Sequence, residues 1–326
     1  MYSSLFIIVY AFVLIDIVNC DGLSNAPMDT RKYFSDVEED LTKVTWVHRC
    51  NSRADLEAAL NSDVMMIEAD IISGHLESDT GGEPIPVMGH PPSTTSDISL
   101  EQFLHRVLEK RAGKGIKLDF KSTAIFKASE NVLEEFLAKA EVDFPVWINA
   151  DILRGPGVPE SRNVVDAKYF LETCVDKFPI AYISPGWAVD TTSARHLRYE
   201  KKHVDEMTTV LSEANVVHGV TFPVHSGIAS NSVDVLTKLI KTSVEGTTLT
   251  LWSGKNEWVD YGNLRKLIEG VGREKVYIDM PKEMLEKLNK PDESESKGAA
   301  TTNTVGIANM LLVLIGLVCT ILPSTH

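Results

Sequence analysis

Eight short runs of β-branched and other apolar residues recur between residues 44 and 279, and longer amphipathic segments separate them. Runs of this kind predict buried strands, while the spacing of apolar residues between them predicts helices. Regular alternation of strand and helix is typical of a parallel sheet covered by helices. The predicted strands are 44–47, 64–70, 115–120, 146–150, 180–184, 216–222, 248–252 and 275–279.

This alternation matches a (β/α)8 TIM barrel, which typically takes about 250 residues. We therefore predict an α/β fold, a single TIM barrel with a parallel eight-stranded sheet over residues 43–290. An open doubly wound sheet is the alternative, but it usually has fewer strands, and the chain contains no G-x-G-x-x-G or Walker sequence. Residues 71–89, which are rich in Gly, Pro and acidic residues, are expected to form a long loop or a hairpin.

Both ends of the chain have the composition of processing signals. Residues 1–20, with an apolar run over 5–18, are predicted to be a secretory signal peptide. Residues 291–304 form a charged, then small and polar stalk, and residues 305–326 form a hydrophobic tail. This order is typical of a GPI-anchor signal, with a short single membrane span as the alternative. We therefore expect an extracellular protein that is attached to the cell surface by its C-terminal anchor.

The charge balance limits the classes of partner. The chain has 46 acidic and 32 basic residues, a formal net charge of −14, and no long basic run. Nucleic acid and anionic membrane surfaces are therefore poor candidates. Residues 21–42 form a polar, acidic lead-in without recognisable chemistry. Once the terminal segments are set aside, Cys50 and Cys174 remain, either as a disulfide or as two buried free thiols.

Polar residues gather where the first three predicted strands end. They are His48 and Arg49 after the first, Glu68 and Asp70 at the end of the second, and Asp119 and Lys121 at the end of the third. Residues spaced i, i+2 on a strand face the same way, and active sites of barrels lie at the carboxyl ends of the strands. Three carboxylates on neighbouring strands suit Mg²⁺ or Ca²⁺ better than zinc. The sequence therefore predicts a site for a hard divalent cation.

Further residues near these strands suggest phosphate chemistry. His48 and His90 are candidates for a general acid and a general base. Arg49 and Lys121 could neutralise a bound phosphate. Trp252, at the end of the seventh predicted strand, could contact substrate or only pack at the rim. A polar rim that serves recognition without catalysis is the alternative for the whole set.

A resemblance to a known family rests on the segments WVHRCNSRADLEAAL, VMGHPPSTTSDISLEQFL, GIKLDFKS, PVWINADILRGPG and LTLWSG. They resemble segments of the menorin family, a group of extracellular or membrane-tethered animal proteins. The resemblance extends from about Lys43 to Asp279.

The menorin family is in turn similar to the phosphatidylinositol-phospholipase-C-like phosphodiesterases, which include glycerophosphodiester phosphodiesterases and sphingomyelinase D toxins. This similarity implies catalytic roles for His48 and His90, metal binding by Glu68, Asp70 and Asp119, and substrate contacts from Arg49, Lys121 and Trp252. It also implies Mg²⁺ or Ca²⁺ as cofactor. The chain departs from the family pattern at Cys50, where HRG is usual, and at Pro91, where HD is usual.

Two functions are consistent with these residues. The first is a divalent-metal-dependent phosphodiesterase at the cell surface that cleaves a glycerophosphodiester or a lipid headgroup by acid–base chemistry of the two histidines. The second is a non-enzymatic extracellular ligand or co-receptor of the menorin type, which would bind a receptor ectodomain in cell-surface signalling such as neuronal patterning. The residues alone leave activity, substrate and protein partner open.

Overall fold

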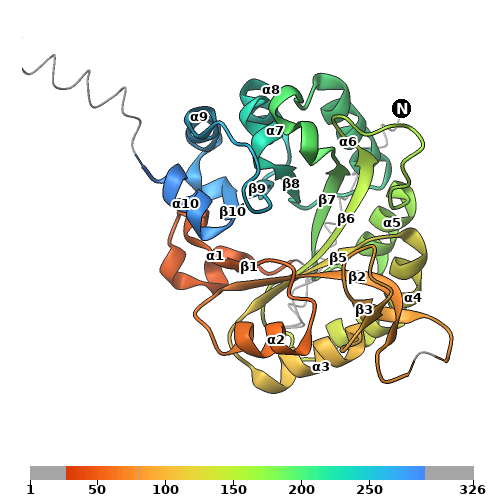
Figure 1. Ribbon diagram of the computed structural model, residues 1–326. Coiled ribbons are helices and arrows are strands. Elements are labelled where there is room, and N and C mark those ends of the chain that lie inside the picture. Colours follow the sequence, from red (N-terminus) through yellow and green to blue (C-terminus); the bar gives the residue numbers. More distant parts are fainter. Residues whose placement is uncertain (1–26, 80, 291–326) are drawn as a thin grey trace, which may run out of the picture.

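The computed structural model describes residues 27–79 and 81–290 (Figure 1). All eight predicted strands are present, with boundaries that differ by a few residues from those predicted. They are β1 (Trp46–Val47), β2 (Met66–Leu76), β5 (Gly115–Phe120), β6 (Val146–Arg154), β7 (Tyr182–Ala188), β8 (Thr221–His225), β9 (Thr248–Trp252) and β10 (Val276–Asp279). Two further strands, β3 (Ile85–Met88) and β4 (Thr95–Ser96), lie beside β2.

The strands form two hydrogen-bonded sheets and not one closed barrel. The first sheet has seven strands, with a parallel path β1-β2-β5-β6-β7, and β3 and β4 both pair with β2. The second sheet is β10-β9-β8, also parallel. Within the described residues no ladder joins β7 to β8 or β10 to β1. The prediction of a closed eight-stranded TIM barrel is therefore wrong; the fold is mixed α/β with a curled, five-stranded parallel half-barrel.

The break between β7 and β8 has a local cause. Pro223, in the middle of β8, has no N–H to donate to a ladder. Its ring lies against Gly186 of β7, where an added Cβ would be 3.0 Å from Pro223 Cγ. At the other break β1 is only two residues long. There a side-chain contact crosses the gap, since His48 Nδ1 lies 2.8 Å from Asp279 Oδ2.

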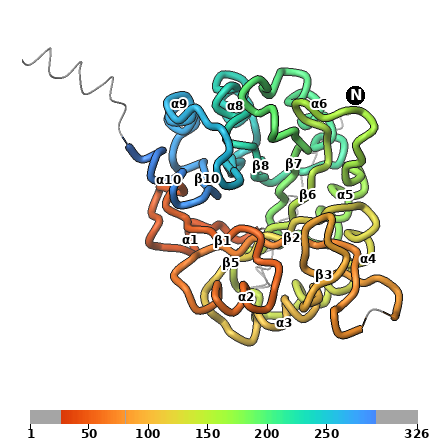
Figure 2. The backbone as a smooth tube through the Cα atoms, viewed as in Figure 1, coloured from red at the N-terminus to blue at the C-terminus, as the bar shows by residue number. Residues whose placement is uncertain are grey.

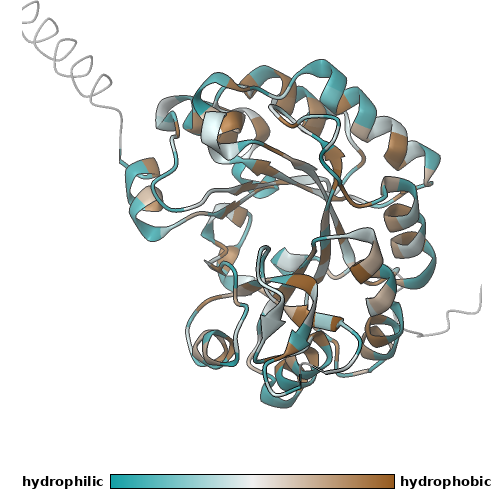
Figure 3. Cartoon of the chain, turned by 45° about the vertical axis from the view of Figure 1, so that its right-hand side comes forward, coloured by the Kyte–Doolittle hydropathy of each residue, from teal (hydrophilic) through white to brown (hydrophobic). Residues whose placement is uncertain are grey.

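Helices cover the outer faces of both sheets, with their hydrophobic sides turned toward the strands (Figure 3). They are α2 (Arg53–Leu60), α3 (Leu100–Lys110), α4 (Thr123–Leu137), α5 (Ala167–Lys177), α6 (Lys201–Glu213), α7 (Ser226–Ser230), α8 (Val233–Thr242), α9 (Tyr261–Val271) and α10 (Lys282–Leu288). Ser52 and Ser122 accept backbone N–H bonds at the starts of α2 and α4. These caps end the turns that follow β1 and β5, so a short turn joins each strand to its helix.

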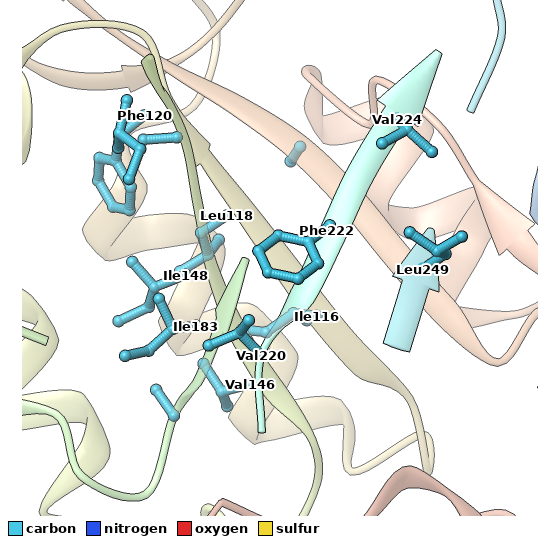
Figure 4. Packing of buried hydrophobic residues seen from close by; sticks show 14 of the residues in the cluster. Ile116, Leu118, Phe120, Val146, Ile148, Ile183, Val220, Phe222, Val224 and Leu249 are labelled. Atoms are coloured by element: carbon cyan, nitrogen blue, oxygen red, sulfur yellow. The ribbon is translucent and has the colours of Figure 1, made fainter. Parts of the chain in front are cut away.

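Strand β5 shows how the core and the site share one element. Ile116, Leu118 and Phe120 are buried in the main hydrophobic core against the helices (Figure 4). Because successive residues of a strand face opposite sides, Lys117 and Asp119 face the concave interior of the curled sheet. The apolar residues fix the strand in the core, and this places the polar residues in the interior.

The segment before β1 covers the amino ends of the strands. It contains α1 (Thr30–Tyr33) and the 3₁₀ turns Ser35–Val37 and Leu41–Lys43. Val37 and Leu41 join a second apolar cluster that also includes Trp147 and Tyr277, and Figure 2 shows this segment beside β10. The polar lead-in thus has an apolar side that the sequence-based prediction did not identify. This segment packs at the amino ends of the strands and does not cover their carboxyl ends.

The region between β2 and α3 is a hairpin, one of the two forms expected for residues 71–89. Residues 71–74 of β2 pair with β3 in antiparallel register. The expected signal peptide, stalk and anchor signal lie outside the described residues. Within the described range, no helix combines the length and apolar composition needed to cross a bilayer.

Cys50 and Cys174 are buried free thiols. Burial raises the pKa of both, and at Cys50 the nearby carboxylates of Asp55 and Glu68 add to this, raising its pKa to about 12. A raised pKa leaves less of the reactive thiolate at any lower pH. The structure thus contains two free thiols and no disulfide between Cys50 and Cys174.

We expect neither thiol to react with iodoacetamide in the native protein at pH 8, because both are inaccessible and almost entirely protonated. After unfolding in guanidinium chloride both should be labelled, as peptide mass spectrometry can show residue by residue. Labelling of native Cys50 or Cys174 within minutes at pH 8 would contradict this burial.

Candidate functional site

The carboxyl ends of β1, β2 and β5 bring most of the predicted site residues together. Glu68 pairs in register with Lys117 on β5, and Asp70 pairs with Asp119. The turn after β1 carries His48 to Asn51, and Lys121 follows β5 directly. The i, i+2 spacing of Glu68 with Asp70, and of Asp119 with Lys121, places both side chains of each pair on the same face, as predicted.

The turn after β1 is fixed by Glu68. Arg49 has a φ of 60°, in the left-handed region that non-glycine residues rarely adopt. Its N–H donates to Glu68 Oε2 at 2.7 Å, and the N–H of Cys50 donates to the Glu68 carbonyl oxygen at 2.8 Å. Such a conformation costs on the order of 1–3 kcal/mol and persists only where the surroundings hold it. Glu68 therefore positions the turn that carries His48 and Arg49.

Glu68, Asp70 and Asp119 form a compact carboxylate cluster. Each offers one oxygen, and these oxygens all lie within 4.8 Å of one another. Two oxygens bound to one ion can be separated by up to twice the metal–oxygen distance, about 4.2 Å for Mg²⁺ and about 4.6–5.2 Å for Ca²⁺. The oxygens thus lie close enough together to serve as ligands of one Ca²⁺, and of the smaller Mg²⁺ after contraction.

Lys121 and Asn51 donate hydrogen bonds to the carboxylates of this cluster. Lys121 Nζ lies 2.6 Å from Asp70 Oδ1 and also donates to Asp119 Oδ2. Asn51 Nδ2 donates to Asp70 Oδ2 at 2.8 Å, and the N–H of Asp70 donates back to Asn51 Oδ1. Arg49 Nε is 3.7 Å from Asp70 Oδ2. Asp70 is therefore fixed by an amide and two cations, while Arg49 and Lys121 stay beside the cluster.

Burial and neighbouring charge shift the pKa values of the carboxyl groups in opposite directions. Burial raises the pKa of Glu68. The charge of His48 reduces this rise, and the charge of the nearby Asp70 adds to it. Burial would also raise the pKa of Asp70, but Lys121, the hydrogen bond from Asn51 and the charge of His90 together outweigh it, and the pKa is lowered. Two like carboxylates close together favour ionisation of one over the other. A bound cation would relieve this repulsion.

His48 connects the two sheets at the site. Its Nδ1 lies 2.8 Å from Asp279 Oδ2 and 3.3 Å from Glu68 Oε2. Burial alone would lower the pKa of His48, but the charges of Glu68 and Asp279 raise it to about 9. Asp279 was not predicted as a site residue. It ends the last strand, so the strand-end rule that selected Asp119 could have found it.

His90 follows β3, which pairs with β2 just beyond Asp70. The N–H of Gly89 donates to the Asp70 carbonyl oxygen at 2.9 Å, and the charge of His90 helps to lower the pKa of Asp70. His90 Nδ1 is 2.7 Å from the Pro91 carbonyl oxygen. His90 and Arg49 line one groove with a volume of about 350 Å³. The structure thus brings both predicted histidines to the end of β2 that carries the carboxylate cluster.

Trp252 is less closely connected to the site. It ends β9 in the second sheet, and among the described residues its ring contacts His225, with centroids 5.0 Å apart. His225 is buried, and its Nε2 lies 2.7 Å from Glu257 Oε2. Trp252 is in register with Asp279, the partner of His48. Trp252 therefore lies one strand away from Asp279 and is not part of the carboxylate cluster.

Two more charged groups face the interior and were not singled out as site residues. Lys117 on β5 is buried, and its charge lowers the pKa of Glu68. Asp151 on β6 keeps an exposed side chain, and desolvation among the surrounding groups together with the charge of Asp119 raises its pKa to about 6. Asp151 on β6 and Asp279 on β10 extend the polar interior beyond the three predicted strands.

The fold and the site define an α/β protein with an acidic centre flanked by histidines at the carboxyl ends of its parallel strands. Residues 40–285 match the Menorin N-terminal domain. The human protein FAM151B is 37% identical over 243 residues, which cover 74% of this chain and 84% of that relative. The chain therefore belongs to the menorin family.

Two solved structures are distantly similar. One is 2,3-dimethylmalate lyase, a PEP mutase/isocitrate lyase superfamily member, with a TM-score of 0.41 and 10% identity over 77% of each chain. The other is the GH53 catalytic domain of Ignisphaera aggregans, with a TM-score of 0.38 and 10% identity over 79% of this chain and 86% of that chain. At these TM-scores neither likeness bears on the fold or the function of the chain.

Proposed function

We propose that the protein is a divalent-cation-dependent phosphodiesterase, related to the phosphatidylinositol-phospholipase-C-like enzymes, that cleaves a glycerophosphodiester or a lipid headgroup. The observation that carries the proposal is the cluster of Glu68, Asp70 and Asp119, with oxygens within 4.8 Å, beside His48 and Lys121. Hard oxygen ligands next to cationic side chains and an imidazole are the groups that phosphoryl transfer requires.

Glu68, Asp70 and Asp119 would hold Ca²⁺ or Mg²⁺, which polarises phosphoryl oxygens when bound. The guanidinium of Arg49 and the ammonium of Lys121 would bind the remaining phosphate charge. Lys121 can do this only by giving up part of its contact with the carboxylates, which a cation would replace. On binding of substrate and cation, the carboxylates would exchange part of their contact with Lys121 for contact with the cation.

The two histidines would move the protons. His48 Nδ1 is held by Asp279 and His90 Nδ1 by the Pro91 carbonyl oxygen, so in each ring Nε2 would be the atom that exchanges a proton. One histidine takes the proton of the attacking nucleophile as its bond to phosphorus forms. The other donates a proton to the alcohol oxygen as the old phosphorus–oxygen bond breaks. Asp279 keeps the His48 ring oriented through this exchange.

Binding without turnover is the second candidate, and one observation favours it. Lys121 Nζ already bonds Asp70 and Asp119, so the carboxylates have a cation without any metal. In this case the protein would act as a ligand or co-receptor for a receptor ectodomain at the cell surface. The same polar end of the strands would serve recognition.

A turnover experiment separates the two candidates. We expect the purified protein to release p-nitrophenol from bis(p-nitrophenyl) phosphate, and the free alcohol from glycerophosphocholine or sphingomyelin, in the presence of Ca²⁺ or Mg²⁺. Excess EDTA should abolish the release. Equal rates with the ions and with EDTA, or no release from any of the three compounds, would reject the phosphodiesterase and leave the binding function.

A further inference from the structure

A second charged surface lies apart from the carboxylate cluster. Residues 194–203, which include the 3₁₀ turn Thr191–His196 in part and the start of α6, contain four Lys or Arg residues and one carboxylate. Exposed Arg195, His196 and Arg198 form the ridge between two adjoining grooves with volumes of about 740 and 780 Å³. This density of cations is unusual for a chain with a net charge of −14.

Cations from distant parts of the chain join this ridge. Lys266 of α9 lines one of the two grooves, and Arg154 at the end of β6 lines the other. We call Arg154, Arg195, His196, Arg198 and Lys266 the basic ridge. It is a product of the fold, since α9 and the end of β6 are far apart in sequence.

Among the described residues no salt bridge joins a cation of the basic ridge to a carboxylate, unlike many cations elsewhere, although the charge of Arg198 helps to lower the pKa of Glu200. Arg106 pairs with Glu57, and Arg273 pairs with Asp40. Within the described part of the chain, no carboxylate lies within salt-bridge distance of Arg154, Arg195 or Arg198. Arg154 Nε donates to the Arg162 carbonyl oxygen at 2.8 Å, and the Arg195 guanidinium lies 6.0 Å from the centre of the Trp258 ring.

Acidic residues also line the grooves, four of them against five Lys or Arg residues, so the lining keeps a small net positive charge. They are Glu160, Glu200, Glu206 and Asp234. Glu200 is already neutralised by Lys202 at 2.9 Å. At physiological ionic strength charges are screened beyond about 8 Å, so the acidic remainder of the protein has little effect on a ligand bound at the ridge.

We propose that the basic ridge binds a sulfated polysaccharide chain. The cations lie along two adjoining grooves, which suits an extended polyanion better than a single small anion. An anionic membrane is less suitable, because the exposed large hydrophobic residues of the described chain are Ile85, Val217 and Val244, none of which lines either groove. Membrane-binding surfaces usually combine basic residues with apolar side chains that enter the lipid.

The test uses the full-length protein and immobilised heparin as the polyanion, at 0.15 M NaCl with EDTA. EDTA removes any contribution from a metal at the carboxylate cluster, so this test is independent of the proposed enzymatic function. Wild type should be retained and should elute as salt rises. The double variant Arg195→Ser/Arg198→Ser should bind about thirtyfold more weakly, given roughly fivefold for each cation near an anionic surface.

The matched control is Arg111→Ser/Lys168→Ser, which removes the same charge from exposed sites with only long ion pairs, 3.9 and 3.8 Å. It should bind heparin like wild type. Equal weakening in both double variants would show a general charge effect and overturn the proposal. No retention of wild type would do the same, as would binding to phosphatidylserine vesicles without binding to heparin.

Discussion

Replacing His48 with Asn should lower kcat/KM for divalent-dependent cleavage of bis(p-nitrophenyl) phosphate by about 10²–10⁴-fold, the usual contribution of a general acid or base. Asn can keep a hydrogen bond to Asp279 in place of the one from His48 Nδ1, but it has no group corresponding to Nε2. The substitution therefore removes the proton exchange while it preserves most of the local structure. Initial rates at saturating Ca²⁺ or Mg²⁺ measure the effect.

His105→Asn is the matched control for this substitution. His105 lies on α3 with 67% of its side chain exposed, 3.7 Å from Glu109, and is not part of the site. Its rate should equal that of wild type, and both variants should have circular dichroism spectra like that of wild type. A folded His48→Asn variant with wild-type turnover would show that His48 does not take part in the chemistry.

The second large effect concerns cation binding and stability. Calcium at a hundred times its Kd should stabilise the native protein by about 2.7 kcal/mol, because an ion that binds only the folded state shifts the unfolding equilibrium. For a domain of this size we expect Tm to rise by about 5–10 °C. In Asp119→Asn the rise should be largely lost, since one of the three carboxylate ligands becomes a neutral amide.

Differential scanning calorimetry in EDTA and in CaCl2 gives this difference for each variant. Glu109→Gln serves as the control, because it removes one carboxylate charge from the exposed surface of α3. It should retain the full calcium-induced shift. An equal shift in Asp119→Asn and wild type would place the bound ion away from the cluster.

Local pattern was sufficient to locate the strands. The predicted strands 115–120 and 248–252 coincide with β5 and β9, where apolar residues alternate with polar ones and most positions are buried. The prediction for 216–222 was less accurate, since β8 begins at Thr221. Residues 216–219 have the composition of a strand but lie in a loop, because strand propensity depends on the neighbours that a segment meets.

The closure of the sheet could not be read from the same pattern. Alternation of strands and helices shows that strands run parallel, and it does not show which edges bond. The break between β7 and β8 depends on the contact between Pro223 and Gly186, which are 37 positions apart in the sequence. A proline in a strand indicates a lost donor, yet only the packed structure shows which neighbour lacks the bond.

Some features of the site follow from the local sequence, and others depend on the tertiary structure. The i, i+2 spacing of Glu68 with Asp70, and of Asp119 with Lys121, follows from the two-residue period of a strand, so the sequence alone placed each pair on one face. The pairing of His48 with Asp279 joins residues 231 positions apart, and only the approach of β1 to β10 brings it about.

The sequence by itself thus determined the strands, the orientation of the carboxylates along them and membership of the menorin family. The tertiary structure decided that the sheet stays open, that Asp279 orients His48, that Lys121 lies between two carboxylates, and that distant arginines form one basic ridge. The physical reason is the range of the interactions. Backbone geometry and burial act over a few residues, whereas charge pairing and edge bonding depend on segments that folding alone brings together.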